Sequence, residues 1–297
     1  MLNEIEQRAR ELQIACHQPV VSMLAGEYRS VFKGVGLEFD QIREYAPGDD
    51  VRLIDWKVTA RTGHAYIKQY IEDRQLTLWL LVDASASFLI GEEESAKAAA
   101  AAEICALLGF SAVANHDRVG LALFTDRIEL VERPRRGTGQ MLRLIERLLA
   151  FTPPPRKTDV GAALDEFHAH SGKHEIVFLI SDFQSPPFDL ALRRARLRQS
   201  LHAICIEHEQ EQTLPRVGLL RLQDSETREI CVVDTDSASV QTKFAAAVVR
   251  RVAARSEKFA SADVDLLELT TGDDCAETLR GFLEMLRWKG GARNASR

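Results

Sequence analysis

LTLWLLVDASAS, residues 76–87, is an almost wholly apolar run that ends abruptly in Asp83, Ser85 and Ser87. An apolar run of this length, bounded by polar residues, predicts a strand buried on both faces of a sheet. The carboxylate and the two hydroxyls follow the carboxyl end of this strand, which is where open α/β sheets place their ligands. Donors that are all oxygen suit a hard cation such as Mg²⁺. The segment therefore predicts a ligand site, with a metal ion as its candidate occupant.

The pattern Asp-x-Ser-x-Ser after such a strand resembles the metal-ion-dependent adhesion site of von Willebrand factor type A domains. That resemblance implies a further threonine, matched by Thr158 before the helix-like segment VGAALDEF, and a second aspartate, matched by Asp182 after the apolar run 176–180. The implied ligands of Mg²⁺ or Mn²⁺ are Asp83, Ser85, Ser87, Thr158 and Asp182. Two carboxylates and a divalent ion sum to zero formal charge, so the ion could still accept a partner's carboxylate.

A simpler interpretation of the first three residues remains open. Asp and Ser after a strand often cap the next helix or form a turn, and a pattern this short also arises by chance. What favours the metal site is that Thr158 and Asp182 follow in the order and context that the family requires.

Length and composition limit the classes of protein to consider. The 297 residues suffice for one large domain with an appendage or for two domains, and the net charge of -6 disfavours a protein devoted to nucleic acid. No apolar stretch approaches the roughly 20 residues of a membrane helix, and the start MLNEIEQRAR is charged, unlike a signal peptide. The five cysteines are scattered, as in reduced intracellular proteins. We expect a cytoplasmic protein without membrane insertion.

Apolar runs alternate with helical patterns from about residue 75, which predicts an α/β fold with a doubly wound, mostly parallel sheet. The resemblance implies that this sheet is of the von Willebrand type. A basic segment at 133–140 is interpreted as a turn. The expected division is 1–74 for an N-terminal helix and β-rich appendage, 75–290 for the α/β domain and 291–297 for a flexible tail. The expected strands are 76–82, 119–124, 176–180, 201–206 and 264–269; the helices are 95–114, 140–150, 160–170, 188–199, 240–258 and 276–288; and a hairpin lies within 218–234.

The segment of residues 36–74 closely resembles the signature of a bacterial family, a domain of unknown function that precedes a von Willebrand type A core. Members are commonly encoded beside MoxR-type AAA+ ATPases, so the resemblance implies such an ATPase and its client as partners. It extends to 222–235 and so covers nearly the whole chain, with Arg228 standing where the family often has glycine. The matching residues are Arg43-Glu44-Tyr45, Pro47-Gly48-Asp49-Asp50, Arg52, Ile54-Asp55-Trp56 and Ala60-Arg61-Thr62-Gly63.

The charged residues of this signature allow two interpretations. They could pin the appendage to the core through carboxylate and guanidinium pairs, with Trp56 as an apolar anchor. They could instead form a partner-binding face beside the ion, since Trp and Arg are common interface anchors. The residues in question are Arg43, Asp49, Asp50, Arg52, Asp55, Trp56 and Arg61.

Three functions are compatible with these patterns. The first is a non-enzymatic, metal-dependent interaction module that works as an adaptor for the ATPase. The second is a Mg²⁺-dependent hydrolase of phosphate esters or peptides, which requires a nucleophile or general base beside the ion. The third is a scaffold whose site holds no metal. The sequence favours the first, because position 85 is Ser rather than a second Asp and no Gly-x-Ser-x-Gly or Ser-His-Asp arrangement can be assembled.

Overall fold

A computed structural model describes residues 2–16, 19–32, 37–46, 49, 54–72, 75–89, 96–152, 156–223 and 230–295. The chain divides into two compact units. Unit 1 comprises Met1–Val31 with Thr77–Arg297, and unit 2 comprises Phe32–Leu76.

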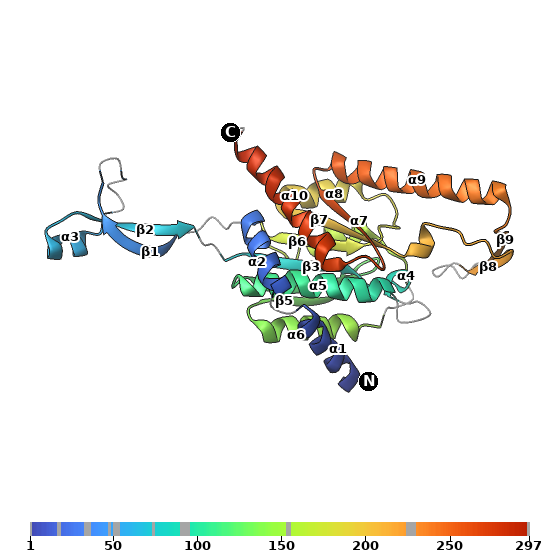
Figure 1. Cartoon of the computed structure of the whole chain (residues 1–297), viewed down its shortest axis with the longest axis horizontal. Helices are drawn as coiled ribbons and strands as arrows, with labels where there is room; N and C mark the ends of the chain where they lie inside the picture. Colours follow the sequence, from blue (N-terminus) through green and yellow to red (C-terminus); the bar gives the residue numbers. More distant parts are fainter. Residues whose placement is uncertain are drawn as a thin grey trace. The chain divides into compact units, whose positions relative to one another are not determined.

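Unit 1 is built on a six-stranded sheet with the order β10-β7-β6-β3-β4-β5 (Figure 1). All neighbouring pairs are parallel except β4 and β5, which are antiparallel. The sheet is therefore mostly parallel and mixed α/β, as the sequence predicts. Its strands are β3 (Thr77–Asp83), β4 (Arg118–Phe124), β5 (Ile128–Arg135), β6 (Ile176–Ser181), β7 (Ser200–Glu207) and β10 (Asp265–Thr270).

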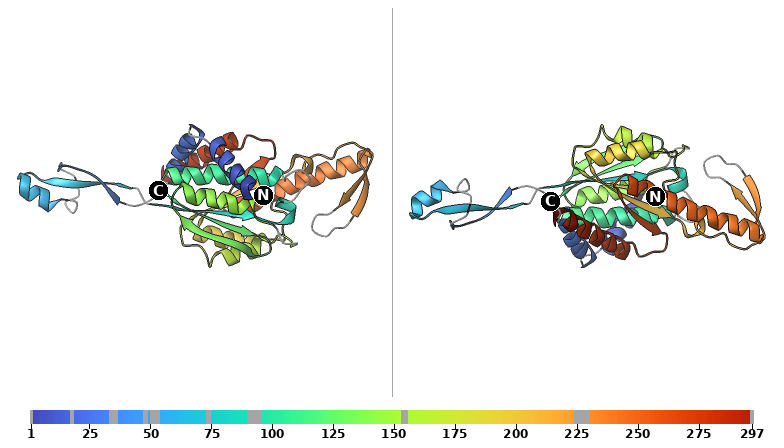
Figure 2. Two further views of the ribbon diagram at one scale, coloured as in Figure 1. Left: turned by 90° about the horizontal axis from the view of Figure 1, so that it is seen from below. Right: turned by 90° about the horizontal axis from the view of Figure 1, so that it is seen from above.

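Helices cover both faces of this sheet (Figure 2), so β6 is buried along its whole length and β3 is buried at every residue except Thr77. On one face, side chains of α7 (Val160–Phe167), α8 (Asp189–Arg198) and the end of α9 (Ala238–Ser261) join one apolar core with Trp79 and Leu81. The helices α5 (Ala96–Ala114), α6 (Thr138–Leu149) and α10 (Cys275–Ala295) pack together on the other. The short α4 (Ala86–Leu89) follows β3, and a 3₁₀ turn, η2 (Glu209–Glu211), follows β7.

The N-terminal helices α1 (Leu2–Ala15) and α2 (Pro19–Val31) belong to unit 1, where α1 packs on α6 and α2 packs on α5 and α10. The expected division grouped them with the β-rich segment as 1–74. Contacts place the boundaries near residues 31 and 77 instead, because Leu24 and Tyr28 of α2 are fully buried. The expected tail from 291 also differs, since α10 continues to Ala295.

The expected hairpin is present as β8 (Leu219–Gln223) paired with β9 (Ile230–Asp234). The strand β5, by contrast, was not expected, and it includes Arg133 to Arg135 of the segment interpreted as a turn. In unit 2, β1 (Leu37–Glu44) pairs antiparallel with β2 (Tyr66–Glu72), and α3 (Trp56–Thr62) lies between them in the chain.

One described helix, α5, is long and apolar enough to cross a membrane by length and composition alone. The expectation that no stretch approaches that length therefore needs correction. Most of α5 is buried inside unit 1, because it is covered by the sheet on one side and by α6, α10 and α2 on the others.

Candidate functional site

The sheet topology brings Asp83 and the residues after β6 together at the carboxyl ends of the parallel strands. The chain leaves β3 toward β4 and β5 on one side, and then returns to β6, which pairs with β3 on the other. Ligands of open α/β sheets bind at the carboxyl ends of strands where the order reverses in this way. Asp83 ends β3 and Asp182 directly follows β6, so the two aspartates of the predicted site stand at this switch point.

Asp83 is fully buried, and both of its carboxylate oxygens accept a hydrogen bond. The backbone N–H of Ser85 donates to Oδ1 at 2.9 Å, and the hydroxyl of Ser181 donates to Oδ2 at 2.7 Å. Burial and the nearby charge of Asp182 raise the pKa of Asp83 to about 7, although these hydrogen bonds act to lower it. The two aspartates are thus close enough to repel each other.

Thr158 is buried in the segment that leads into α7. The backbone N–H of Asp159 donates to the carbonyl of Thr125 after β4 at 3.0 Å, and that of Val160 donates to Ser185 Oγ after β6 at 3.0 Å. Asp159 also caps α7 by accepting from the N–H of Ala162. These bonds hold the threonine segment at the same edge of the sheet as the aspartates.

Two serines, Ser85 and Ser87, belong to the predicted site. Ser85 is fully buried beside Asp83, where its N–H makes the bond given above. Ser87 lies in α4, but its side chain is outside the described residues.

A buried lysine that the sequence analysis did not single out lies at this site. Lys97 of α5 donates to Asp182 Oδ2 at 2.9 Å and approaches Glu211 Oε1 to 2.5 Å. The other oxygen of Asp182 accepts from the backbone N–H of Gln184 at 3.1 Å. Burial acts to lower the pKa of Lys97, but Asp182 and Glu211 outweigh it and raise the pKa, so the ammonium stays charged.

The charges at this edge do not balance. Asp83, Asp182 and Glu211 contribute three carboxylates, whereas Lys97 is their one cationic partner among the described residues. The neighbouring Arg251 and Arg255 are matched by Glu207 and Glu268. With Asp83 in its ionised form, two negative charges therefore remain, and the donors are oxygens of carboxylates and hydroxyls. This set fits a divalent hard cation in charge and in chemistry.

Backbone strain marks the residue after Asp182. Phe183 has a positive φ of 58°, which is uncommon for a bulky side chain. Its N–H donates to Ser181 Oγ, and its ring packs against Phe259 at a centroid distance of 4.7 Å. Strain of this kind persists where the surrounding structure holds it, and it is found preferentially at ligand sites.

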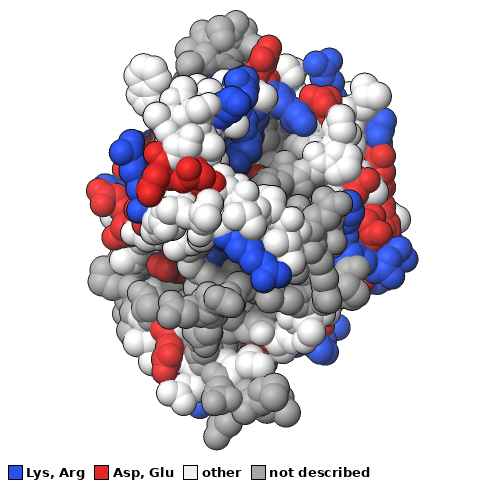
Figure 3. All heavy atoms as spheres, turned by 90° about the vertical axis from the view of Figure 1, so that its right-hand side faces the viewer, with Lys and Arg blue, Asp and Glu red and all other residues white. Residues whose placement is uncertain are grey.

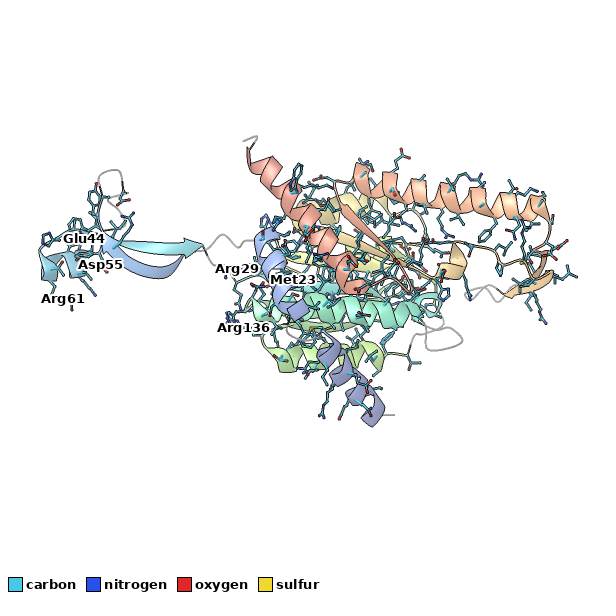
Figure 4. All side chains as sticks on the ribbon, viewed as in Figure 1. Met23, Arg29, Glu44, Asp55, Arg61 and Arg136 are labelled. Atoms are coloured by element: carbon cyan, nitrogen blue, oxygen red, sulfur yellow. The ribbon has the colours of Figure 1, made fainter. Side chains whose placement is uncertain are left out.

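The charged signature in unit 2 makes bonds within its own segment. Arg43 forms a bidentate pair with Asp49 at 2.7 and 2.8 Å, and Asp55 caps α3 by accepting from the N–H of Lys57 and Val58. Trp56 is 69% exposed, and its role as an apolar anchor of the appendage stays a prediction. Asp50 and Arg52 lie outside the described residues. Asp55 and Arg61 are labelled in Figure 4 at the two ends of α3.

Solved structures with some likeness to the chain are remote in sequence. BatB from Bacteroides thetaiotaomicron has a TM-score of 0.42 and 9% identity, covering 71% of this chain and 98% of its own. The pilus adhesin SpaC from Lactobacillus rhamnosus GG has a TM-score of 0.38 and 12% identity, covering 73% and 30%. At these scores the likeness supports no conclusion about function.

Proteins similar in sequence to this chain occur in mycobacteria. An uncharacterized protein of Mycobacterium bovis and its counterpart in Mycobacterium tuberculosis, Rv1480, are each 31% identical over 282 residues, which is 94% of this chain and 88% of theirs. The family model described as protein of unknown function DUF58 matches residues 41–254. Since that match spans more than half of the chain and the mycobacterial relatives align along nearly all of it, the chain belongs to the DUF58 family.

Proposed function

We propose that this chain is a non-enzymatic protein-interaction module of the von Willebrand type that binds a carboxylate of a partner through a divalent cation, Mg²⁺ or Mn²⁺. Asp83, Ser85, Ser87, Thr158 and Asp182 would hold the ion. When bound, the ion would supply a Lewis-acidic position that accepts an anionic oxygen from the partner.

The observation that carries this proposal is the unbalanced charge at the carboxyl edge of β3 and β6. Burying carboxylates without a cation is costly, and Asp83 has no ion pair among the described residues. A divalent ion would supply the two missing positive charges. It would also lower the pKa of Asp83 again, because it stabilises the carboxylate form.

Lys97 is the observation that counts most against a bound ion, because its ammonium already pairs with one oxygen of Asp182. Its ammonium contacts Glu211 as well as Asp182. A metal ion that takes Asp182 Oδ2 would displace one of these contacts and leave the other, so Lys97 would remain paired. The lysine would then act as a competitor that sets the metal affinity.

The hydrolase alternative requires a base that can reach a substrate. Asp83 has a pKa near neutrality, but it is fully buried and both of its oxygens already accept protein hydrogen bonds. A general base must lie within hydrogen-bond distance of the proton it removes. These properties favour binding over turnover.

The proposed partner is a MoxR-type AAA+ ATPase together with its client, for which this chain would be an adaptor or co-chaperone in the cytoplasm. This part of the proposal depends on the resemblance of the signature segment in residues 36–74 and on membership of the DUF58 family. Partner binding would be coupled to the ion, because the ligand loops would rearrange when an external carboxylate joins the site.

The metal is tested by calorimetric titration of the full chain with Mg²⁺ and Mn²⁺. We expect saturable binding that Asp83→Asn and Asp182→Asn abolish. Asp165→Asn is the matched control, since Asp165 is an exposed carboxylate paired with Arg194 on the surface. No saturable heat with the native chain, or native-like binding by Asp83→Asn, would leave only the scaffold interpretation.

The partner is tested by affinity capture from the native host with Mg²⁺ and with EDTA, using the native chain and Asp83→Asn. We expect a AAA+ ATPase to be recovered by the native chain in Mg²⁺ alone. Equal recovery in every condition would contradict a metal-mediated contact. Hydrolysis of generic phosphate or peptide substrates that depends on Asp83 would favour the enzyme instead.

A further inference from the structure

A pocket of about 330 Å³ opens beside Asp182. The loop after β6 forms one wall, with Phe183 and Phe188, and α9 forms the other. Three basic residues of α9, Arg251, Arg255 and Lys258, face the pocket at a spacing of four and three residues, which places them on one side of the helix. Figure 3 looks onto this end of unit 1, where Lys and Arg side chains lie among Asp and Glu.

One of the three cations, Arg255, is paired with carboxylates inside the protein. Arg255 is buried, and it donates to both oxygens of Glu207 at 2.9 and 3.2 Å and to Glu268 at 2.6 Å. Burial acts to lower the pKa of Arg255, but the carboxylates outweigh burial, so the pKa is raised. Arg255 therefore joins α9 to β7 and β10 and has a structural role.

The other two cations keep hydrogen-bond donors that the described residues do not use. Arg251 donates through Nη2 to the Glu211 carbonyl and pairs with Glu207, but its buried Nε–H has no acceptor. Lys258 lies 4.0 Å above the Phe188 ring and 3.8 Å from Asp189, which is beyond hydrogen-bond distance. An anion that enters would give the buried Arg251 Nε–H its missing acceptor and would form a charge-assisted bond with Lys258.

The geometry points to this pocket as the receptor for a second carboxylate of the bound partner, next to the one at the ion. Arg251 and Lys258 would bind the carboxylate of an Asp or Glu side chain, while Phe183 and Phe188 contact its aliphatic part. This inference deepens the proposed function, in that the partner segment becomes one with two acidic residues close together.

Size and position support this occupant. The volume is at the lower limit of ligand pockets, which suits a side chain better than a large cofactor. Asp182 lines the pocket and belongs to the candidate metal site, so the two sites are continuous. Asp182 is already paired with Lys97, which reduces its repulsion of an incoming anion.

The test uses the ¹⁵N-labelled full chain and glutarate, a dicarboxylate that imitates an acidic side chain. Titration in EDTA at constant ionic strength should shift the Nε–H resonance of Arg251 in a saturable way; Arg251→Lys identifies that signal. Lys258→Gln should weaken the affinity about tenfold, as the loss of one charged hydrogen bond predicts. Arg250→Gln, an exposed neighbour on α9, should leave it unchanged. Thermal melts verify that each variant folds.

The outcomes separate this inference from the metal site. Binding of glutarate in EDTA, and by Asp83→Asn, supports the pocket even if calorimetry shows no metal binding. Binding that requires Mg²⁺ would place the probe on the ion and overturn the inference. The inference would also be overturned if glutarate did not shift the Arg251 Nε–H resonance, or if Arg250→Gln weakened the affinity as much as Lys258→Gln. Tighter binding of inorganic phosphate than of glutarate would overturn it as well.

Discussion

Burying the Asp83 carboxylate next to Asp182 costs folding free energy when Asp83 is ionised. Its pKa in the folded chain is about 7, against an ordinary value of 3.8, so the folded state holds the proton more tightly than the unfolded state. The free energy of unfolding therefore falls as the pH rises from about 4 to about 7, and above about pH 7 the contribution of the protonated Asp83 is lost. Metal binding would oppose that loss, because it requires the deprotonated carboxylate.

The first prediction follows from this sign. In EDTA, the melting temperature of the native chain should fall between about pH 5 and pH 8 more steeply than that of Asp83→Asn. Asparagine keeps the shape and can still accept from Ser85 N–H, but it carries no charge to bury. At the higher pH the variant should be the more stable, by a few kcal/mol. If the melting temperatures of the two proteins change in parallel with pH, burial does not raise the pKa of Asp83.

The second prediction concerns Lys97. Lys97→Met removes the cation between two carboxylates, and breaking a buried pair in this way costs about 3–5 kcal/mol. Because the vacated position leaves Asp182 uncompensated, Mg²⁺ should raise the melting temperature of the variant more than that of the native chain. Lys173→Met, at an exposed site, is the control. If Mg²⁺ stabilises both proteins equally, Lys97 does not compete with the ion.

At the scale of residues, strand ends were predictable and the buried lysine was not. Asp83 and Asp182 each follow an apolar run, and parallel strands place such residues at one edge. Lys97 lies in a helix of alanines, AKAAAAAE, where nearly every face can be buried, so periodicity gives no reason to place it inside. Its partner Glu211 is distant in sequence, and only the tertiary fold brings the two together.

At the scale of elements, the helix α2 is a structural part of unit 1. Leu24 is fully buried, the Asn115 side chain donates to the Ala25 carbonyl at 2.9 Å, and Glu27 pairs with Arg287 of α10. The helix thus closes the outer layer over α5 and α10 rather than serving as a separate arm.

The third prediction tests this role of α2. Leu24→Ala should destabilise unit 1 by about 2–5 kcal/mol, because it removes buried methyl groups and leaves a cavity. Met23→Ala, at the neighbouring position labelled in Figure 4, should change stability by no more than about 0.5 kcal/mol, since Met23 is 44% exposed. Denaturant unfolding of both variants measures the difference. Equal effects would mean that α2 is not held on the core.

One strand of the main sheet, β5, was not predicted, and the reason is physical. The strand β5 is at the edge of the sheet, where its side chains are only half buried, and it contains Pro134. Charge and proline are tolerated at an edge, so the sequence of β5 lacks the alternation or apolar run that identifies a strand. The central strands, by contrast, lie within one or two residues of their predicted bounds because burial on both faces fixes their composition.

At the scale of the whole molecule, the two units differ in how much core they possess. Unit 1 contains the six-stranded sheet and its buried apolar layers, whereas the buried apolar side chains described in unit 2 are Phe32 and Ile67. A two-stranded sheet with one short helix is marginal in water, because it buries too little apolar surface to offset the entropy of ordering the chain.

The fourth prediction is that unit 1 folds without unit 2. A chain joining Met1–Val31 to Thr77–Arg297 through a glycine-serine linker should unfold cooperatively and bind Mg²⁺ as the full chain does, since the five candidate ligands are all in unit 1. Phe32–Leu76 alone should show the narrow amide dispersion of an unfolded peptide. Loss of ATPase capture by the joined chain, with metal binding intact, would assign the exposed Trp56 and its neighbours to the partner face. Cooperative melting of isolated Phe32–Leu76 would contradict the assignment of the stabilising core to unit 1.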